Sequence, residues 1–392
     1  MGPGDVEQGR AGEADPFFCV PNQLVVHRKD LDRLKEALGD IEEIESSVPR
    51  SAYAVVSPLT GARRVDELTG PSRLAALSGL RVSPRYVFGS CGARAPMAAR
   101  PSTATAEQLR PAPPSATALT VAVIDTGIVL HDEASDGAAH PWLAGRVTFT
   151  AAADEDPLPT DGSRLGPATG HGTLIAGVVL GESPRTEVLV RRTMQGGLAP
   201  DDLVAEAITK AAARGVRLFN LSFCGDVIDE DAPPLIDEAL HDLPMDAVVV
   251  AAAGNFGDKR PVWPAASKRV LAVGAVKSRT DRTKADFSSS GVWVDAYAPG
   301  VDVVAPFCFY EETAAFGDPG VADQHFKGWA RASGTSIAAA VVTGRIAQLA
   351  IAKGVDPATA AYLLLQESPS VSVDGFERPF VDSIAEIVPA PA

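Results

Sequence analysis

From residue 119 onward, short apolar runs alternate with segments that have the periodicity of helices. The runs are rich in Val and Ala, as expected for strands buried on both faces, and they cover residues 119–125, 187–192, 216–222, 246–252 and 270–276. Helical patterns lie between them near 171–181, 201–214 and 232–242. This alternation predicts an α/β domain with a parallel sheet and helices on both of its faces.

The residues before this domain predict a smaller unit. Their patterns indicate a strand, a helix, two strands or a hairpin, a second helix and a closing strand, at 23–26, 30–38, 44–56, 65–77 and 80–88. The order βαββαβ predicts a small α+β domain of ferredoxin-like type at 22–88. The acidic, Gly-rich start is predicted to be a disordered N-terminus (1–21), and the Ala-, Pro-, Ser- and Thr-rich stretch 89–118 a linker to the larger domain (119–392).

Composition narrows the functional classes. The chain has 392 residues, 46% of them hydrophobic, which is enough for one large core and a smaller domain. A formal charge of −15 argues against nucleic acid and anionic membranes as partners. The cysteines lack CxxC spacing, so no zinc site or disulfide framework is indicated (Cys19, Cys91, Cys224, Cys308). With no signal-like N-terminus and no stretch expected to span a bilayer, we expect a cytoplasmic protein with reduced thiols.

A serine stands at the start of the longest apolar helical pattern. Gly334 and Thr335 precede Ser336, and small or apolar residues continue through 337–350 without a wide polar stripe. A helix that is apolar all round is buried, and its N-terminus favours negative charge. Ser336 is therefore a candidate nucleophile, with Ser333 or Thr335 as the capping residue. Taken alone, such a segment is more often an N-cap serine on a core helix.

Three more polar residues stand at element ends. Asp125 ends the first apolar run, in the motif Asp-Thr-Gly. The same motif occurs in aspartic proteases, but such a protease would carry a second copy, and this sequence has one. His171 lies between two glycines at a helix start, where a lone histidine is more often structural. Asn255, in Gly-Asn-Phe-Gly, fits either a turn or an amide directed at an oxyanion. Since parallel strands share one carboxyl edge, Asp125, Ser222 and Asn255 are predicted to lie there together.

Together these motifs resemble those of the subtilisin-like serine peptidases (subtilases, peptidase family S8). Asp-Thr-Gly, Gly-His-Gly-Thr, Gly-Asn and Gly-Thr-Ser-x-Ala occur in that family's order, and the resemblance covers about residues 119–366. It implies a serine endopeptidase that acts on polypeptides without a metal or cofactor. The implied roles are a catalytic triad (Asp125, His171, Ser336), an oxyanion donor (Asn255) and a substrate-binding set (Ser222, Phe223, Cys224, Ala253, Gly254).

The same resemblance identifies the N-terminal domain as a propeptide-like module, so the protein is expected to be made as a zymogen. The module is expected to dock on the catalytic domain, with the linker along or near the cleft. At about 30 residues the linker reaches roughly 30 Å even as a flexible coil, so docking meets no obstacle of length. Release is expected either from self-cleavage in the linker or from a regulatory partner protein.

The sequence departs from the family's pattern at three places. Ile337 and Ala340 stand where the family has Met and Pro after the serine, and a missing proline changes how the helix starts. The segment after Gly181 is too short for the calcium loop of many secreted members, so no calcium is expected there. Phe223 and Cys224 replace smaller residues of the substrate-binding strand, which alters the expected subsites.

Two other functions compete with peptide hydrolysis. A catalytically weak subtilase-fold protein could hold peptides in its cleft, although all four chemical positions are filled. A lipase or esterase of the α/β-hydrolase fold would need Gly-x-Ser-x-Gly ahead of the acid and the histidine. Neither that motif nor that order is present.

Overall fold

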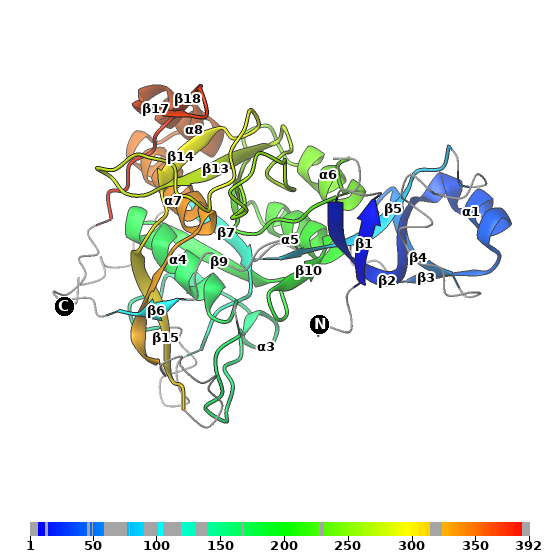
Figure 1. Cartoon of the computed structure of the whole chain (residues 1–392), viewed down its shortest axis with the longest axis horizontal. Coiled ribbons are helices and arrows are strands. Elements are labelled where there is room, and N and C mark those ends of the chain that lie inside the picture. The colour runs from blue at the N-terminus through cyan, green and yellow to red at the C-terminus, as the bar shows by residue number, and fades with distance from the viewer. Residues whose placement is uncertain are drawn as a thin grey trace.

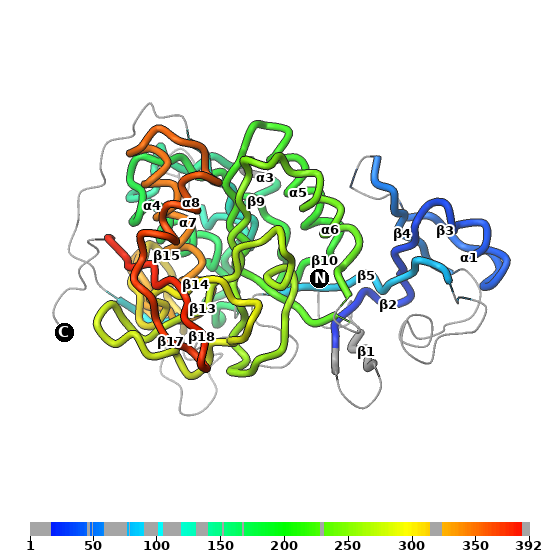
Figure 2. The backbone as a smooth tube through the Cα atoms, turned by 90° about the horizontal axis from the view of Figure 1, so that it is seen from above, coloured from blue at the N-terminus to red at the C-terminus, as the bar shows by residue number. Residues whose placement is uncertain are grey.

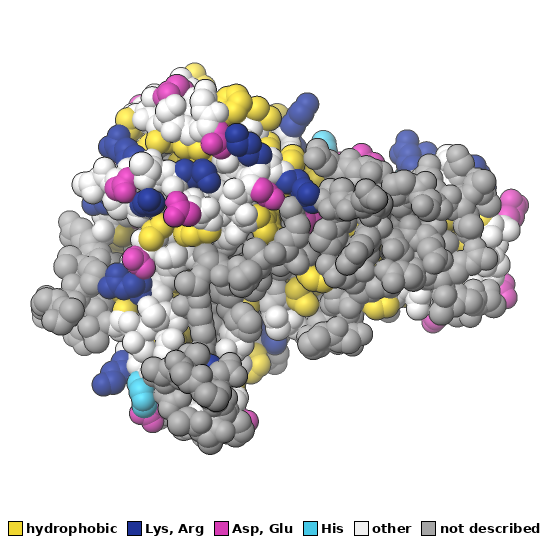
Figure 3. Space-filling model, viewed as in Figure 1, with side chains coloured by type: hydrophobic (Ala, Val, Ile, Leu, Met, Phe, Trp, Pro, Cys, Tyr) yellow, Lys and Arg dark blue, Asp and Glu magenta, His cyan; other side chains and the backbone are white. Residues whose placement is uncertain are grey.

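The computed structural model describes residues 7–11, 15–44, 48, 50–58, 77, 79–89, 101–104, 119–130, 140–166, 168–227, 231–313 and 324–385. It has a large α/β body and a smaller N-terminal domain beside it, as both views show (Figures 1 and 2). On the face in Figure 3, side chains of both charge signs are interspersed over the described part of the large body.

The large body is built on a parallel sheet of seven described strands. Their order is β14-β13-β12-β11-β7-β9-β8, and every neighbouring pair is parallel. The strands are β7 (Thr120–Asp125), β8 (Val147–Thr148), β9 (Glu187–Arg192), β11 (Leu218–Leu221), β12 (Val248–Ala252), β13 (Val270–Val276) and β14 (Ala296–Pro299). The predicted α/β architecture is confirmed.

Helices cover both faces because alternate residues of each strand point to opposite sides. On β7, Val121 and Val123 join the apolar cluster formed with α4 (His171–Glu182), α7 (Thr335–Lys353) and α8 (Pro357–Glu367). Ala122 and Ile124 join the cluster formed with α5 (Asp201–Ala213) and α6 (Pro234–His241). Two separate apolar layers therefore enclose the sheet, one on each face.

Helix α7 is buried, as its all-round apolar pattern predicts. It is long and apolar enough to cross a membrane by length and composition alone, but 72% of the relevant window is buried inside the protein. Its buried side chains belong to one apolar cluster with residues of the sheet, α4 and α8. It is the central core helix of the α/β body.

The N-terminal domain has the predicted fold wherever the structure describes it. Its strands are β2 (Asp15–His27), β3 (Ile41–Ile44), β4 (Tyr53–Pro58) and β5 (Val82–Gly89), in the antiparallel order β5-β2-β4-β3. After β2 come a short 3-10 turn, η2 (Arg28–Asp30), and α1 (Leu31–Leu38). The second helix predicted at 65–77 lies outside the described residues, apart from Leu77.

The predicted disorder of residues 1–21 is wrong where the structure describes them. Strand β1 (Glu7–Ala11) pairs antiparallel with β2, which itself begins at Asp15. Phe17 and Cys19 are fully buried, and the Phe17 ring packs edge-on against Tyr86 at 5.8 Å between centroids. Burial of these apolar side chains stabilises the ordered segment by more free energy than the loss of conformational entropy costs.

The predicted linker, 89–118, also contains structure. Gly89 is the last residue of β5, and β6 (Ser102–Thr103) pairs with β16 (His325–Ala332), the partner of β15 (Val303–Glu311). The large body is completed by α3 (Ala151–Asp154), β10 (Leu198–Pro200), β17 (Ser370–Val373) and β18 (Phe376–Pro379). Backbone pairing therefore ties both described parts of the linker, Gly89 and Ser102–Thr103, to the larger domain.

The two domains share an extensive interface. Strand β5 pairs antiparallel with β10 of the larger domain, as Figure 2 lets the reader follow. One apolar cluster runs without a break from Leu24 and Phe88 of the N-terminal domain to Ala205 and Ile208 on α5. At the edge of this interface Ser51 donates to the Glu238 carboxylate on α6, and Ala52 N donates to its other oxygen at 2.8 Å.

Candidate active site

Asp125 and His171 form a buried pair. Asp125 ends β7 and is fully buried, and His171 is the first residue of α4 and is 9% exposed. His171 Nδ1 lies 2.7 Å from Asp125 Oδ1, which also accepts a hydrogen bond from Thr126 N at 2.7 Å. The chain turns sharply on both sides of this pair, at Gly127 (φ 101°) and Gly170 (φ 78°), where a residue with a side chain would be strained.

The environment of His171 favours its charged form. Burial alone would lower the pKa of the imidazole, but the charge and hydrogen bond of Asp125, with a further contribution from the charge of Asp156, raise it above the ordinary value. This arrangement suits a base that must hold a proton briefly during a reaction.

Ser336 is the second residue of α7 and is 5% exposed. Its Oγ donates to the backbone oxygen of Ser222 at 3.0 Å, and Ser222 Oγ donates to the backbone oxygen of Ser336 at the same distance. Among the hydrogen bonds of the described residues, none joins Ser336 to His171. The structure thus pairs Asp125 with His171, and Ser336 with the end of β11.

Asn255 is fixed by the residue that precedes Ser336. Its Oδ1 accepts hydrogen bonds from Thr335 N and Thr335 Oγ1, both at 2.9 Å, and Thr335 Oγ1 in turn accepts from Gly254 N at 3.1 Å. With Oδ1 held in this way, the Nδ2 end of the amide faces away from Thr335. The expectation that Thr335 or Ser333 caps α7 is wrong, since α7 has no side-chain cap and Ser333 Oγ instead accepts from Asp302 N.

Two of the predicted substrate-binding residues, Phe223 and Cys224, contact the N-terminal domain. Gly89 and Cys224 exchange two backbone hydrogen bonds, at 3.0 and 3.1 Å. On its other edge the same stretch of β5 pairs with β10, with Gly89 opposite Leu198 and Phe88 opposite Ala199. The end of β5 therefore lies as an extended strand between β10 and the segment that follows Ser222.

Phe88 is fully buried in this arrangement. Its ring lies 6.5 Å from that of Phe223, centroid to centroid. A Cβ atom added to Gly225 would lie 2.6 Å from the Phe88 ring, so the absence of a side chain at Gly225 makes room for it. Ala253 and Gly254, the last of the predicted set, are buried beside Asn255, and Ala253 N donates to Val273 O at 2.9 Å.

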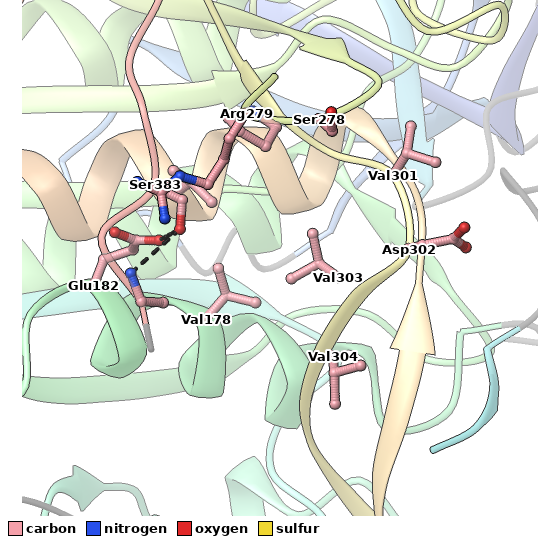
Figure 4. Close-up of a pocket in the computed structure, with 12 residues that line it drawn as sticks. Val178, Glu182, Ser278, Arg279, Val301, Asp302, Val303, Val304 and Ser383 are labelled. Carbon is pink, nitrogen blue, oxygen red and sulfur yellow. Dashed lines mark hydrogen bonds between the residues drawn. The ribbon is translucent and has the colours of Figure 1, made fainter. Parts of the chain in front are cut away.

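A separate cavity of about 210 Å³ lies at the other end of α4 (Figure 4). It is lined by apolar residues of α4, α7 and β15 and by Glu182, whose carboxylate accepts hydrogen bonds from the Ser383 hydroxyl and from Ile384 N. None of the candidate residues lines it. Since α4 has 12 residues, Glu182 and His171 are separated by roughly 16 Å along the helix axis.

No metal site emerges within the described part of the chain, where no group of three or more His, Cys, Asp or Glu side chains is close enough to hold an ion. The segment after Gly181 is short, as the sequence indicates: Thr186 N donates to Ser183 O at 3.1 Å, and β9 begins at the next residue.

One site residue was missed from the sequence. Asp156 lies in a loop rich in Asp and Pro, and its carboxylate reaches the residues next to both Asp125 and His171. Loop residues carry no periodicity, so no local pattern could have identified it.

Comparison with known proteins agrees with this geometry. The model of the subtilase family matches residues 116–381. The thermophilic serine proteinase of Bacillus sp. (strain AK1) is 35% identical over 200 residues, which are 47% of this chain and 44% of that protein. Thermitase of Thermoactinomyces vulgaris is 31% identical over 195 residues, 46% of this chain and 62% of that protein. These matches span less than two thirds of either relative.

Similarity of fold extends to the N-terminal domain. The crystal structure of fervidolysin from Fervidobacterium pennivorans, described as a keratinolytic enzyme related to subtilisin, superposes with a TM-score of 0.64 at 19% identity. The superposition covers 96% of this chain and 61% of that one. With the family model matched over most of its length and with the architecture of that fold, the chain belongs to the subtilase family of serine peptidases.

Proposed function

We propose that this protein is a serine endopeptidase that hydrolyses polypeptides through Asp125, His171 and Ser336. The observation that carries the proposal is the buried contact of 2.7 Å between Asp125 and His171, formed at the carboxyl edge of the sheet. Ser336, the second residue of the buried helix α7, hydrogen-bonds to Ser222, which follows the neighbouring strand β11. Membership in the subtilase family supports these roles, which subtilisin itself exemplifies.

In the proposed reaction Ser336 Oγ leaves the Ser222 carbonyl and donates its proton to His171 Nε2 as the oxygen attacks the substrate carbonyl carbon. Asp125 holds Nδ1 protonated and stabilises the imidazolium, consistent with the raised pKa of His171. The imidazolium then gives its proton to the leaving amine, and the acyl group stays on Ser336 until water releases it. In this second half, His171 takes a proton from the attacking water and then returns a proton to Ser336 Oγ, which restores the serine.

The tetrahedral oxyanion would be held by Asn255 Nδ2 and the Ser336 N–H. The contacts of Thr335 with Asn255 Oδ1 support this role because they fix the amide without using its donors. The N-terminus of α7 adds its dipole. In subtilisin, itself a member of this family and the source of the figure, losing one such donor costs about 2.7–4 kcal/mol of barrier.

We further propose that the N-terminal domain is an inhibitory prodomain. Its last strand takes the extended, doubly paired position, between β10 and Cys224, in which a substrate strand would bind. Affinity from main-chain hydrogen bonds and specificity from alternate side chains are typical of strand addition. While this strand is bound, a polypeptide substrate is excluded.

The test uses the full-length protein and a fluorophosphonate probe. The wild type is expected to be labelled and to hydrolyse a casein or peptide substrate, and Ser336→Ala to do neither while keeping its melting temperature. A folded wild type that binds peptides but is neither labelled nor hydrolytic would replace the enzyme proposal by the peptide-binding alternative. Intact mass of the two proteins side by side would show whether the N-terminal domain is removed by self-cleavage.

A further inference from the structure

The loop that contains Asp156 lies directly against the turn that follows Asp125. Ile128 N donates to Asp154 O and Asp156 N donates to Ile128 O, both at 2.8 Å, so the loop and the turn are joined by backbone hydrogen bonds on both sides of Glu155. Asp156 is 7% exposed. A carboxylate this deeply buried must be compensated by hydrogen bonds or charge.

Its hydrogen bonds reach both halves of the Asp125–His171 pair. Asp156 Oδ2 accepts from Thr126 Oγ1 at 2.8 Å and from Gly170 N at 2.7 Å. Thr126 follows Asp125 in the chain, and Gly170 precedes His171. The Thr126 hydroxyl also accepts from Gly172 N at 3.0 Å. The residues on both sides of His171 are therefore tied, through Asp156 and Thr126, to the residue after Asp125.

The packing around this network leaves no room for a side chain at Gly127 or Gly172. A Cβ atom on Gly172 would lie 2.2 Å from Gly127 O, and one on Gly127 would lie 2.4 Å from Asp154 O. The three segments thus touch backbone to backbone. A change at Asp156 is expected to move the start of α4 relative to Asp125 because no side chain between them could absorb the shift.

Asp156 also acts on His171 through its charge. The groups that face it are Asp125 on β7, His171 on α4, Arg192 on β9 and Cys308 on β15. Burial raises the pKa of Asp156 to about 6, opposed by the hydrogen bonds from Gly170 and Thr126 and by Arg192, with Asp125 adding to the rise. Burial also raises the pKa of the Cys308 thiol to about 12, so this thiol stays neutral near pH 7.

We propose that Asp156 is a positioning residue of the active site, which fixes His171 against Asp125 through Thr126 and Gly170 and supplies a second negative charge that supports the imidazolium. This inference rests on the proposed peptidase function. Asp156 contacts neither the strand that follows Ser222 nor Asn255 in the hydrogen bonds described, so its effect is expected in kcat and in the pH profile, with KM unchanged.

The experiment measures kcat and KM against pH for the full-length wild type, Asp156→Asn and Asp156→Ala. Asparagine can still accept from Thr126 and Gly170 but lacks the charge, so the acid limb of kcat/KM should move to lower pH. Alanine also removes the hydrogen bonds, and kcat at the plateau should fall by about 100-fold, the cost of a misplaced catalytic group.

Glu182→Gln is the matched control. Glu182 is a buried carboxylate on the same helix and likewise accepts from one hydroxyl and one backbone N–H (Figure 4), and burial raises its pKa. Because it lies at the far end of α4, neutralising it should leave both the acid limb and kcat unchanged. An acid limb of Asp156→Asn that coincides with that of the wild type, or an equal shift in Glu182→Gln, would overturn the inference.

A second pair of variants covers the case in which the Asp156 variants do not fold. Thr126→Val removes the hydroxyl that links Asp156 to Gly172, and Thr126→Ser retains it. We expect kcat to fall at least tenfold in the valine variant and to stay near the wild-type value in the serine variant, with KM unchanged in both. Equal kcat in the two would refute the positioning role, whereas an unlabelled, inactive wild type would refute the proposed function instead.

Discussion

The interface between the two domains is expected to depend on one buried ion pair. Arg85 on β5 makes a bidentate contact with Asp202 on α5: Nε lies 2.9 Å from Oδ1, and Nη2 lies 2.7 Å from both carboxylate oxygens. Nη1 donates to Gln23 Oε1 at 2.5 Å. The two charged side chains are only 14% and 4% exposed, so solvent screens them little.

Replacing Arg85 by Met would remove the bidentate, positively charged partner of the Asp202 carboxylate. Asp202 would stay buried next to Asp201, whose pKa is already raised well above its ordinary value, first by burial and then by the charge of Asp202, and is lowered by Arg85. Removing one partner of a buried pair costs about 3–5 kcal/mol. At 3 kcal/mol the equilibrium between docked and undocked N-terminal domain shifts by more than about 100-fold.

The assay is the rate at which a fluorophosphonate labels Ser336 in the full-length protein. If the docked strand β5 covers the cleft, Arg85→Met should be labelled at least tenfold faster than the wild type. The comparison holds whether or not the linker is cut, because the same interface covers the cleft in both cases. Arg33→Met is the control, since Arg33 on α1 is exposed and its contact with Asp30 is 3.6 Å long.

A double-mutant cycle tests the electrostatic reason. Adding Asp202→Leu to Arg85→Met removes the buried carboxylate that Arg85 faces, so the double variant should be labelled more slowly than Arg85→Met. Labelling of Arg85→Met at the rate of the wild type or of Arg33→Met would show that this ion pair does not hold the N-terminal domain over the cleft.

Three further outcomes are expected. Alanine at Asp125, His171 or Ser336 should remove most peptidase activity without unfolding the chain, and the three losses should not add. Because His171 must be neutral to act as base and its pKa is raised, kcat/KM should fall with decreasing pH at a higher pH than for an unperturbed histidine. EDTA should leave the melting temperature unchanged, as the turn at 183–186 holds no liganding loop; a steep drop would indicate a bound metal.

Much of the large domain could be predicted because its signals are local. Strands buried on both faces are continuous apolar runs, and the predicted runs at 187–192 and 270–276 have the bounds of β9 and β13. Helix α5 differs from its predicted range by one residue. The positions of Asp125 and His171 at element ends followed from the same patterns, whereas the pairing of the two residues was implied only by the resemblance to the subtilases.

Features that depend on distant partners could not be predicted. Near the start of β2, Phe17 packs against Tyr86, which is almost 70 residues away in the chain. The sequence alone does not show this contact, so the segment was predicted to be part of a charged, Gly-rich tail. Asp156 stands in a loop, and its function depends on Thr126 and Gly170. The N-terminus of α7 was predicted as a nucleophile site, but the roles of Thr335 in fixing Asn255 and of Ser222 in holding Ser336 depend on strands β12 and β11.

The predicted substrate-binding segment and the N-terminal domain were predicted from separate patterns, but in the structure they contact each other. Phe223 and Cys224 are larger than the residues the family usually carries, and both face the end of β5: Cys224 through two backbone hydrogen bonds and Phe223 through its ring against Phe88. A larger side chain in a binding strand restricts what fits beside it. Since the strand that fits here belongs to the same chain, we propose that these two departures favour the chain's own N-terminal domain. Substrates that displace it are expected to need a large apolar side chain where Phe88 lies.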